Sequence, residues 1–295
     1  REFMKYLTII QARSSSSRLP RKSLMPIAGI PLVHLCAIRA KNDFSRLIVA
    51  TSNEASDDDL AVMLLAAGVE VFRGSLTNVL SRFIDIVDSH MLADEDSIIR
   101  LTGDNPIVDG EFLEMLKTAW EKLGLDYLSG QPVDMSNSNW PHGLSAEFVK
   151  VGLLRDGYLR DKSDSNLEHV TTYARVNAKN KAFGDQVTNL TFRKKYFLTI
   201  DTAEDYKIYR YFGLYCDAID EGSFSIDNID SKGFISPNVN SYKSNYIVDQ
   251  TTLSDIDMIT NEEDLAMPTL NYVKDKNGKA IDSEILMPIA FQLAQ

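Results

Sequence analysis

The stretch from Lys5 to Lys22, KYLTIIQARSSSSRLPRK, decides the fold. Its first part, Lys5–Gln11, is a short apolar run rich in β-forming residues, which predicts a buried strand. The part that follows, up to Lys22, holds serine, proline and charged residues, which are typical of a loop. Helical periodicity then begins at Pro31, where proline suits the first turn of a helix. A buried strand, a polar loop and a helix in this order predict the first unit of an α/β domain.

The same alternation of strand and helix continues to Leu123, with short connections. The predicted strands are 46–50, 69–72 and 97–101, and the predicted helices are 31–41, 56–67, 77–92 and 109–123. This pattern indicates an open, mostly parallel, Rossmann-like sheet with helices on both faces. Ligands of such sheets bind beyond the carboxyl ends of the strands, so we expect the site in the loops 12–23, 51–56, 73–78 and 102–108.

The pattern breaks after Tyr127, where Asn, Ser, Pro and Gly cluster up to Leu144. Beyond the break we expect strands at 145–150, 186–192 and 196–200 and helices at 165–179 and 202–219. We interpret residues 4–247 as one catalytic domain, in which 130–195 form a small β-rich insertion. Residues 248–295 are acidic with weak periodicity, which favours an appended segment over a full domain.

Charge and composition exclude several classes of function. The chain has 295 residues, with 31 Lys and Arg against 42 Asp and Glu, so the formal net charge is −11. Nucleic acids and anionic membrane surfaces are therefore poor partners. We expect no membrane span, since no apolar run approaches the roughly 18 residues required. Two cysteines without metal-ligand spacing predict free thiols in a reducing compartment, so we expect a cytoplasmic protein without structural zinc.

The loop after the first strand concentrates positive charge. Four cations, Arg13, Arg18, Arg21 and Lys22, fall within ten residues of an otherwise acidic chain, next to four consecutive serines. Cations and exposed backbone N–H groups suit an anion, above all a polyphosphate. The glycine patterns of the Walker loop and of the dinucleotide fold are absent. A solvated basic loop is the alternative interpretation.

Two aspartates follow predicted strands. Asp104 lies in RLTGDNP (100–106) and Asp201 in LTIDTAED (198–205). A carboxylate at a strand end is a good ligand for Mg²⁺ that bridges substrate phosphates, although Gly-Asp-Asn-Pro is also good turn chemistry. Thr202 and Asp205 resemble a capping box, which leaves Asp201 available to a ligand. We expect both aspartates and the basic loop to converge on one cavity for metal-assisted phosphoryl or nucleotidyl transfer.

These motifs together resemble the cytidylyltransferases that activate acidic sugars. The basic loop is similar to their ARxxSxRLPxK loop, RLTGDNPIVD to their strand-end metal motif and TIDTAEDY to their second metal motif. VFRGSLTNVLSRF, WPHGLSAEFV and EHVTTYARVN resemble the branch typified by the spore coat polysaccharide protein F. Synthetases for ketodeoxyoctonate and sialic acids are more distant relatives. The resemblance covers Met4 to Ile247, and Arg21 departs from the glycine usual in this branch.

The resemblance implies a GT-A-like nucleotidyltransferase fold and three sets of site residues. The catalytic set, in which Asp104 and Asp201 also ligate Mg²⁺, is Arg13, Lys22, Asp104 and Asp201. The nucleotide-binding set is Ala12, Ser14, Arg18, Arg73, Ser75 and Arg82. The set lining the acceptor pocket is His142, Glu147, Glu168, His169 and Tyr173. For His142 and His169, a packing role is the alternative.

The implied reaction transfers CMP from CTP to an acidic sugar of the nonulosonate or octulosonate type, with release of pyrophosphate, for surface polysaccharide biosynthesis. The resemblance also implies a homodimer with its interface in residues 130–195. One alternative is a cytidylyltransferase for a phosphonate or a phosphorylated alcohol. Another is a GT-A glycosyltransferase, which needs a metal-binding Asp-x-Asp. The candidates for that motif, 94–96 and 255–257, follow no convincing core strand.

Overall fold

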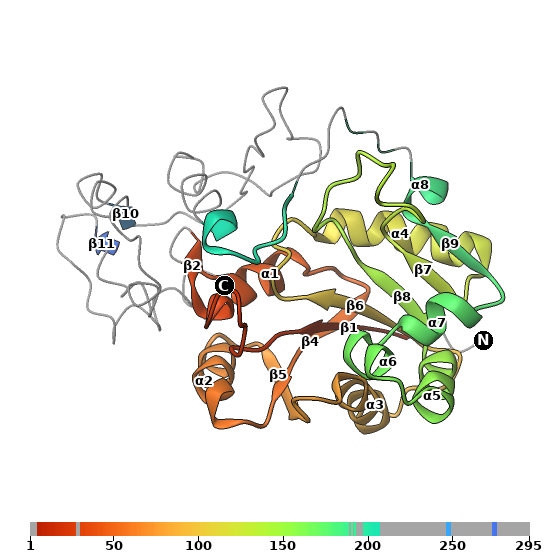
Figure 1. Cartoon of the computed structure of the whole chain (residues 1–295), viewed down its shortest axis with the longest axis horizontal. Helices are drawn as coiled ribbons and strands as arrows, with labels where there is room; N and C mark the ends of the chain where they lie inside the picture. Colours follow the sequence, from red (N-terminus) through yellow and green to blue (C-terminus); the bar gives the residue numbers. More distant parts are fainter. Residues whose placement is uncertain are drawn as a thin grey trace.

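The computed structural model describes residues 5–27, 30–188, 190, 192 and 197–206, and the backbone of two short strands, β10 (Tyr246–Val248) and β11 (Val273–Asp275). Within these residues the fold is built on a seven-stranded sheet of order β5-β4-β1-β6-β8-β7-β9 (Figure 1). Its strands are β1 (Tyr6–Gln11), β4 (Ser45–Ser52), β5 (Glu70–Gly74), β6 (Ser97–Thr102), β7 (Tyr127–Ser129), β8 (Glu147–Lys150) and β9 (Lys181–Phe183). A small hairpin, β2 (Pro26–Ile27) and β3 (Ile30–Pro31), lies outside the sheet.

The sheet is open and mostly parallel, which confirms the predicted fold class. Strands β5, β4, β1 and β6 run parallel, and β9 is parallel to β7. Strand β8 is the exception, since it is antiparallel to both β6 and β7. Its register sets Glu147 directly opposite Arg100 of β6. The one reversed strand thus introduces a carboxylate beside a cation in the middle of the sheet.

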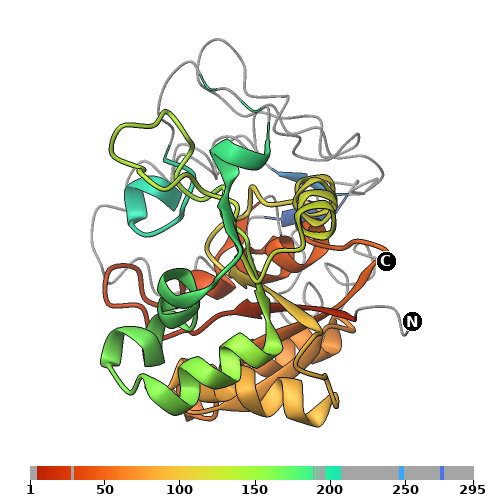
Figure 2. The same ribbon diagram turned by 90° about the vertical axis from the view of Figure 1, so that its right-hand side faces the viewer.

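Helices cover both faces of the sheet (Figure 2). One face packs against α1 (Leu32–Arg39), α2 (Asp58–Ala66) and α4 (Gly110–Leu123). The other packs against α3 (Val79–Ser89), α5 (Val151–Arg160) and α7 (Thr172–Asn177), and α6 (Asp164–His169) lies against these three helices. Alternate residues of β1 divide between the two layers, with Ile10 in the first core and Ile9 in the second. None of the described helices is long and apolar enough to cross a bilayer.

All the strands and helices predicted up to Leu123 are confirmed, each within a few residues of its expected bounds. The differences begin after Tyr127. There, β7, β9 and α5 form without having been predicted, because each is too short or too mixed in polarity to give a clear period. The region 130–195, expected as a small β-rich insertion, contributes β8 and β9 to the main sheet and also carries α5 to α8 (Gly184–Val187).

Three expectations of secondary structure are corrected. The strand predicted at 186–192 is wrong at its start, where α8 forms and the side chain of Gln186 accepts a hydrogen bond from the Phe183 N–H. The strand predicted at 196–200 is wrong for 197–200, where Phe197 makes a single bridge to His142. The helix predicted at 165–179 is two helices, because Val170 takes a φ of 68° and breaks it.

The predicted helix at 202–219 begins as expected, with residues 203–206 helical, and its remainder lies outside the described residues. Cys216, the 255–257 triplet and nearly all of the appended segment 248–295 also lie outside them. Cys36 is a buried free thiol, as predicted.

Candidate active site

The basic loop leaves β1 at the carboxyl edge of the sheet and folds back on itself. The N–H of Ala12 donates to the Ala50 carbonyl of β4 at 3.1 Å, and the N–H of Arg21 donates to the Ser14 carbonyl at 2.9 Å. The hydroxyl of Ser23 closes the far end by donating to the Arg13 carbonyl at 2.9 Å. These bonds fix the path of the backbone, so the cationic side chains share one rigid base.

A buried carboxylate, Asp57, ties the loop to the neighbouring strand. Asp57 is fully buried and accepts hydrogen bonds from the Ser14 N–H at 2.6 Å, the Thr51 hydroxyl at 3.0 Å and both the N–H and the hydroxyl of Ser52. Burial favours its protonated form, but the hydrogen bonds from Ser52, Ser14 and Thr51 outweigh burial and hold the pKa of Asp57 below its ordinary value. Asp57 therefore stays ionised and anchors the loop.

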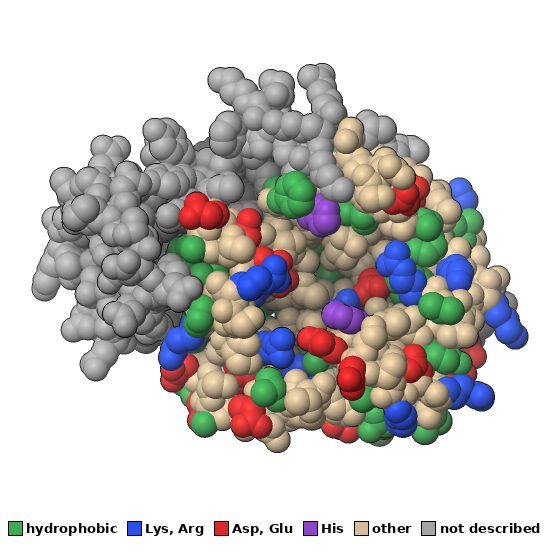
Figure 3. Space-filling view, in the orientation of Figure 1, with side chains coloured by type: hydrophobic (Ala, Val, Ile, Leu, Met, Phe, Trp, Pro, Cys, Tyr) green, Lys and Arg blue, Asp and Glu red, His purple; other side chains and the backbone are tan. Residues whose placement is uncertain are grey.

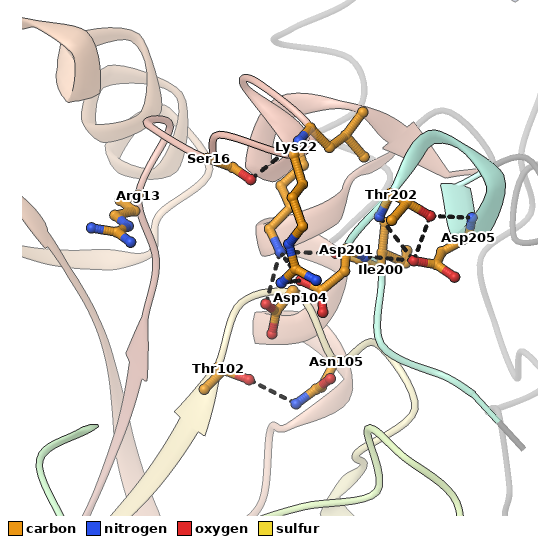
Figure 4. Close-up of polar contacts among 12 residues, drawn as sticks. Arg13, Ser16, Lys22, Thr102, Asp104, Asn105, Ile200, Asp201, Thr202 and Asp205 are labelled. Atoms are coloured by element: carbon orange, nitrogen blue, oxygen red, sulfur yellow. Dashed lines mark hydrogen bonds and ion pairs between the residues drawn. The ribbon is translucent and has the colours of Figure 1, made fainter. Parts of the chain in front are cut away.

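Lys22 brings the two predicted acidic segments together (Figure 4). Its Nζ lies 2.9 Å from Asp104 Oδ2, 2.9 Å from Asp201 Oδ1 and 2.9 Å from the Ile200 carbonyl. Arg18 adds a second cation, with Nη2 3.0 Å from Asp201 Oδ1. The expected convergence of the basic loop and both aspartates is confirmed.

Local structure explains why Asp201 is available for this contact. The side chain of Asp205 accepts from the N–H groups of Asp201 and Thr202, and the Thr202 hydroxyl accepts from the Asp205 N–H. The predicted capping box is confirmed, and it satisfies the helix start without the Asp201 carboxylate. The Ile200 N–H donates to the Asp104 carbonyl at 2.9 Å, so the two acidic segments are also joined through the backbone.

A cavity of about 430 Å³ opens between the basic loop, the carboxyl ends of β1 and β6, the start of α3 and the end of α6. Figure 3 shows the hollow, with charged side chains of both signs and histidine around it. Among the described residues, five cationic side chains and three carboxylates line it, a balance of +2 in a chain of net charge −11. These charged residues are Arg13, Arg18, Lys22, Arg82, Arg100, Asp104, Glu168 and Asp201. Local positive charge of this kind suits a polyanionic ligand.

Nine of the residues predicted for the site line this cavity: Ala12, Arg13, Arg18, Lys22, Arg82, Asp104, Glu168, His169 and Asp201. Six others do not line it. Ser14 is buried and donates its N–H to Asp57. Arg73 donates to the Ser52 and Glu54 carbonyls and pairs with Asp58, and the Ser75 hydroxyl accepts from the Asn78 N–H. These three residues brace the loops around the cavity.

The other three lie on the acceptor side that the resemblance implied. The ring of His142 stacks on Phe197 with centroids 4.8 Å apart, and Tyr173 packs against Gly157. Glu147 is buried behind the cavity floor, where it pairs with Arg100. Trp140 is also buried, and its Nε1 donates to the Leu144 carbonyl and anchors the irregular loop.

Several cavity residues were missed from the sequence. Among them, Gln11, Arg100 and Thr102 form the floor at the ends of β1 and β6. Arg100 belongs to the quoted RLTGDNP motif, and the two-residue period of a strand puts it on the same face as Thr102. That parity is the signal that could have identified Arg100.

Two buried polar atoms on the cavity wall have no hydrogen-bond partner among the described residues, Arg82 Nε and Asn105 Oδ1. Arg82 is 2% exposed, and its Nη1 donates to the Ala50 carbonyl. Burial lowers the pKa of Arg82 to about 10, which still leaves it cationic at neutral pH. Buried polar atoms normally have partners, so both atoms are available to a ligand in the cavity.

The donor set around Lys22 fits a divalent cation that is shared with a substrate. Two carboxylates and a backbone carbonyl surround Nζ. Within the described residues, no group of three or more His, Cys, Asp or Glu side chains is arranged to hold a metal by itself. Mg²⁺ is usually held by one or two carboxylates together with substrate phosphates and water. Asp104 and Asp201 match that requirement.

Comparison with known proteins points to one family. The sequence model of the family described as Cytidylyltransferase matches residues 7–222. The chain is 36% identical over 209 residues to the spore coat polysaccharide biosynthesis protein SpsF of Bacillus subtilis, over 68% of this chain and 83% of that protein. A solved cytidylyltransferase from Leptospira borgpetersenii has a TM-score of 0.61 and 26% identity, over 79% of this chain and 91% of that one. CMP:2-keto-3-deoxy-manno-octonic acid synthetase complexed with CTP shares the fold, with a TM-score of 0.50 and 17% identity, over 70% of this chain and 97% of that one.

Removal of the Lys22 ammonium group tests the electrostatics of the site. We expect metal-free Lys22→Met to lose about 1–3 kcal/mol of unfolding free energy, because its charged hydrogen bonds disappear and two carboxylates remain close together. Mg²⁺ should then raise its melting temperature more than that of the wild type, since the ion can replace the lost cation. Both values are measured by thermal unfolding with EDTA or with MgCl₂.

The control is Arg21→Met, whose pair with Asp59 is exposed and should contribute at most about 1 kcal/mol. Equal losses of unfolding free energy in the two variants would contradict this expectation. So would a Lys22→Met variant whose melting temperature rises with Mg²⁺ no more than that of the wild type.

Asp57 predicts a specific pH dependence of stability. Because its pKa is lowered in the folded state, its contribution is complete above the unfolded value of about 3.9 and is lost as pH falls through the lower folded value. We expect Asp57→Asn to be less stable at pH 7, by about 1–3 kcal/mol, and to lose less stability than the wild type on acidification. Urea unfolding between pH 7 and pH 2.5 measures both effects.

Asp59→Asn is the matched control, since Asp59 belongs to the same aspartate run but is exposed. An identical decline with pH in Asp57→Asn and the wild type would show that Asp57 does not carry this dependence.

Proposed function

Because this chain belongs to the cytidylyltransferase family and is a CTP-dependent nucleotidyltransferase, we propose that it transfers CMP to an acidic sugar of the nonulosonate or octulosonate type and releases pyrophosphate. The product would serve the biosynthesis of a surface polysaccharide. The observation that carries this proposal is the convergence of Lys22, Arg18, Asp104 and Asp201 on one cavity. Cations for a triphosphate and carboxylates for its metal lie there within a few ångströms of one another.

In the proposed reaction, a hydroxyl oxygen of the acceptor forms a bond to the α-phosphorus of CTP. The bond from that phosphorus to the oxygen bridging the α- and β-phosphates breaks, and pyrophosphate leaves with the bonding electron pair. Arg13, Arg18 and Lys22 bind the triphosphate and stabilise the charge that grows on the leaving group. The proton of the acceptor hydroxyl passes to solvent, so no dedicated protein base is assigned.

Asp104 and Asp201 are the residues that would hold Mg²⁺. When bound, Mg²⁺ neutralises phosphate charge and acidifies a coordinated hydroxyl. The protein's own contribution is positional, since the bonds around Lys22 hold the basic loop at a fixed place relative to both carboxylates. Positioning two anionic reactants is a large part of catalysis in such transfers.

The two halves of the cavity suit the two substrates. On the side of β4 and β1, the backbone of Ala12 and the side chain of Arg82 would bind the nucleoside, with Ser14, Arg73 and Ser75 supporting the loops behind them. On the side of β6 and β8, Glu168 and His169 would bind the acceptor. His142 and Tyr173 lie outside the cavity lining, so we assign them to the acceptor side at longer range.

We also propose that the enzyme is a cytoplasmic homodimer with its interface in 130–195. This region exposes three large apolar side chains, Val133, Leu159 and Val176, which are 55–71% accessible to solvent. Large exposed apolar patches mark interaction surfaces, and Leu159 and Val176 lie on the neighbouring helices α5 and α7. Sedimentation measures the mass of the wild type and of a Leu159→Glu, Val176→Glu variant in solution. A monomeric mass for both proteins would contradict the proposed dimer.

The glycosyltransferase alternative finds no support at the 94–96 triplet. It precedes β6, at the amino end of the strand and thus at the edge of the sheet opposite the cavity. Asp94 pairs with Arg155, and Asp96 accepts from the N–H groups of Lys5 and Ala93. These aspartates hold chain segments together. A phosphonate or a phosphorylated alcohol remains the second acceptor class to test.

A pyrophosphate-release assay tests the proposal. We expect Mg²⁺-dependent release with CTP, and much less with ATP, GTP or UTP, in the presence of an acid from a panel of nonulosonic, octulosonic and phosphonate acceptors. Asp104→Asn and Asp201→Asn should each lower turnover on the order of 100-fold or more, because each removes charge that the transition state requires.

Asp59→Asn, on the exposed start of α2, is the control and should keep wild-type turnover. Circular dichroism must show that every variant is folded. Release with a preformed nucleotide sugar alone would favour the glycosyltransferase, and full activity of a folded Asp104→Asn or Asp201→Asn would refute the role of that residue.

A further inference from the structure

We propose that Arg100 binds the carboxylate of the acceptor and thereby determines that the enzyme selects an acid; this inference rests on the proposed function. Arg100 comes from β6 and lies in the cavity floor, with 13% of its side chain exposed. It therefore reaches the cavity from the centre of the sheet, where the backbone is most rigidly held.

The guanidinium group of Arg100 is fixed on two sides. Its Nε donates to Gln11 Oε1 at 2.9 Å, and its Nη1 donates to Glu147 Oε2 at 2.5 Å. Nη2 makes no hydrogen bond to any of the described residues. A guanidinium group has five N–H donors in a planar fork, so the two donors of Nη2 and the second donor of Nη1 remain for a ligand.

Glu147 does not depend on Arg100 alone. The hydroxyl of Tyr127 donates to Glu147 Oε1 at 2.5 Å, and the Thr171 hydroxyl lies 2.9 Å from both carboxylate oxygens. Burial and the adjacent Glu147 raise the pKa of Tyr127, so its phenol stays protonated and donates. Neutral hydroxyl groups thus provide much of the hydrogen bonding of the Glu147 carboxylate. The carboxylate in turn holds the Arg100 guanidinium group in place and balances its charge.

The hydrogen bonds around Glu147 also position His169, at the mouth of the cavity. Thr171, which bonds Glu147, follows Val170, whose φ of 68° is unusual for a β-branched residue. This turn ends α6 immediately after His169, and His169 and Glu168 both line the cavity. The strained turn is therefore clamped to the carboxylate that holds Arg100. Backbone strain of this kind persists where neighbouring contacts over-determine it, often at ligand sites.

The position of Arg100 separates it from the nucleotide. Arg82 bonds the Ala50 carbonyl of β4, and Arg100 belongs to β6, with β1 between them. Two strand spacings are about 10 Å, so the two guanidinium groups serve different parts of the cavity. The triphosphate cations Arg13, Arg18 and Lys22 come from the basic loop. Among the described residues, Arg100 is the cation that lies in the floor on the acceptor side.

A carboxylate is the ligand chemistry that this arrangement favours. A planar fork binds a planar carboxylate through two parallel N–H···O bonds. The floor offers the free N–H donors of one guanidinium group, whereas a polyphosphate is met by the several cations of the loop. Glu168, which lies 3.7 Å from Arg13, supplies a carboxylate that would accept from sugar hydroxyls. An acid that carries several hydroxyls matches both groups.

The test compares acids with their carboxamides. The probes are 2-keto-3-deoxyoctonate and N-acetylneuraminate, each with its carboxamide, assayed by CTP-dependent pyrophosphate release. We expect Arg100→Met to raise the acceptor KM on the order of 30-fold, the usual effect of losing a charge-assisted hydrogen-bond pair. The KM for CTP should stay unchanged, and the preference of the enzyme for acid over carboxamide should disappear.

A double variant separates binding from charge balance. Arg100→Met with Glu147→Gln removes both members of the buried ion pair, so its melting temperature should recover relative to Arg100→Met. Its acceptor KM and its lost acid preference should not recover. If the acceptor KM and the acid preference recover in the double variant, Arg100 acts only as the counter-ion of Glu147, and the proposal is overturned.

The failures of the two proposals are distinguishable. If the wild type uses a panel acid and Arg100→Met keeps the acid preference, the assignment of Arg100 is wrong and the proposed function stands. If the wild type binds CTP but transfers CMP to none of the acids, the acidic-acceptor function fails, and the role of Arg100 fails with it.

Discussion

The contact of one ammonium group with two carboxylates organises this molecule. Lys22 comes from the loop after the first strand, Asp104 from the end of the fourth parallel strand of the sheet, and Asp201 from a segment 179 residues after Lys22. Each group is partly buried, with 12–30% of its side chain exposed. Partial burial strengthens the attraction and makes any unpaired member costly, so the three segments are held in one arrangement.

The rigid part and the polar part of the fold contribute different parts of the site. The sheet supplies the floor, and the polar loops at its carboxyl edge supply the charges. Buried ions that never meet the cavity, Asp57 behind the basic loop and Glu147 behind Arg100, hold the groups that do. An acidic protein can in this way present a locally cationic pocket, because its negative charge is spread over the surface while the cations converge. This arrangement is what a CTP-dependent transferase requires.

Prediction from sequence succeeded where periodicity is local and strong. The strands at 46–50 and 97–101 and the helix at 109–123 were expected because each repeats its apolar residues over its own length. The strand expected at 145–150 formed as β8, but prediction failed for β7 and β9, which are only three residues long. Such strands are defined by their partners across the sheet and not by their own pattern. The helix expected at 165–179 broke at Val170 because Thr171 is tied to Glu147, a contact that no local rule contains.

By itself, the sequence determined the class of fold, the loops that bear the chemistry, and the identity of the cations and aspartates within them. Those features depend on composition and on periods of a few residues, which can be read along one chain. Only the tertiary structure decided that Lys22 contacts both aspartates directly and that Asp57 and Glu147 serve as buried anchors. These outcomes depend on strand order and on the reversal of β8, which are set by packing between distant segments and leave no mark in local sequence.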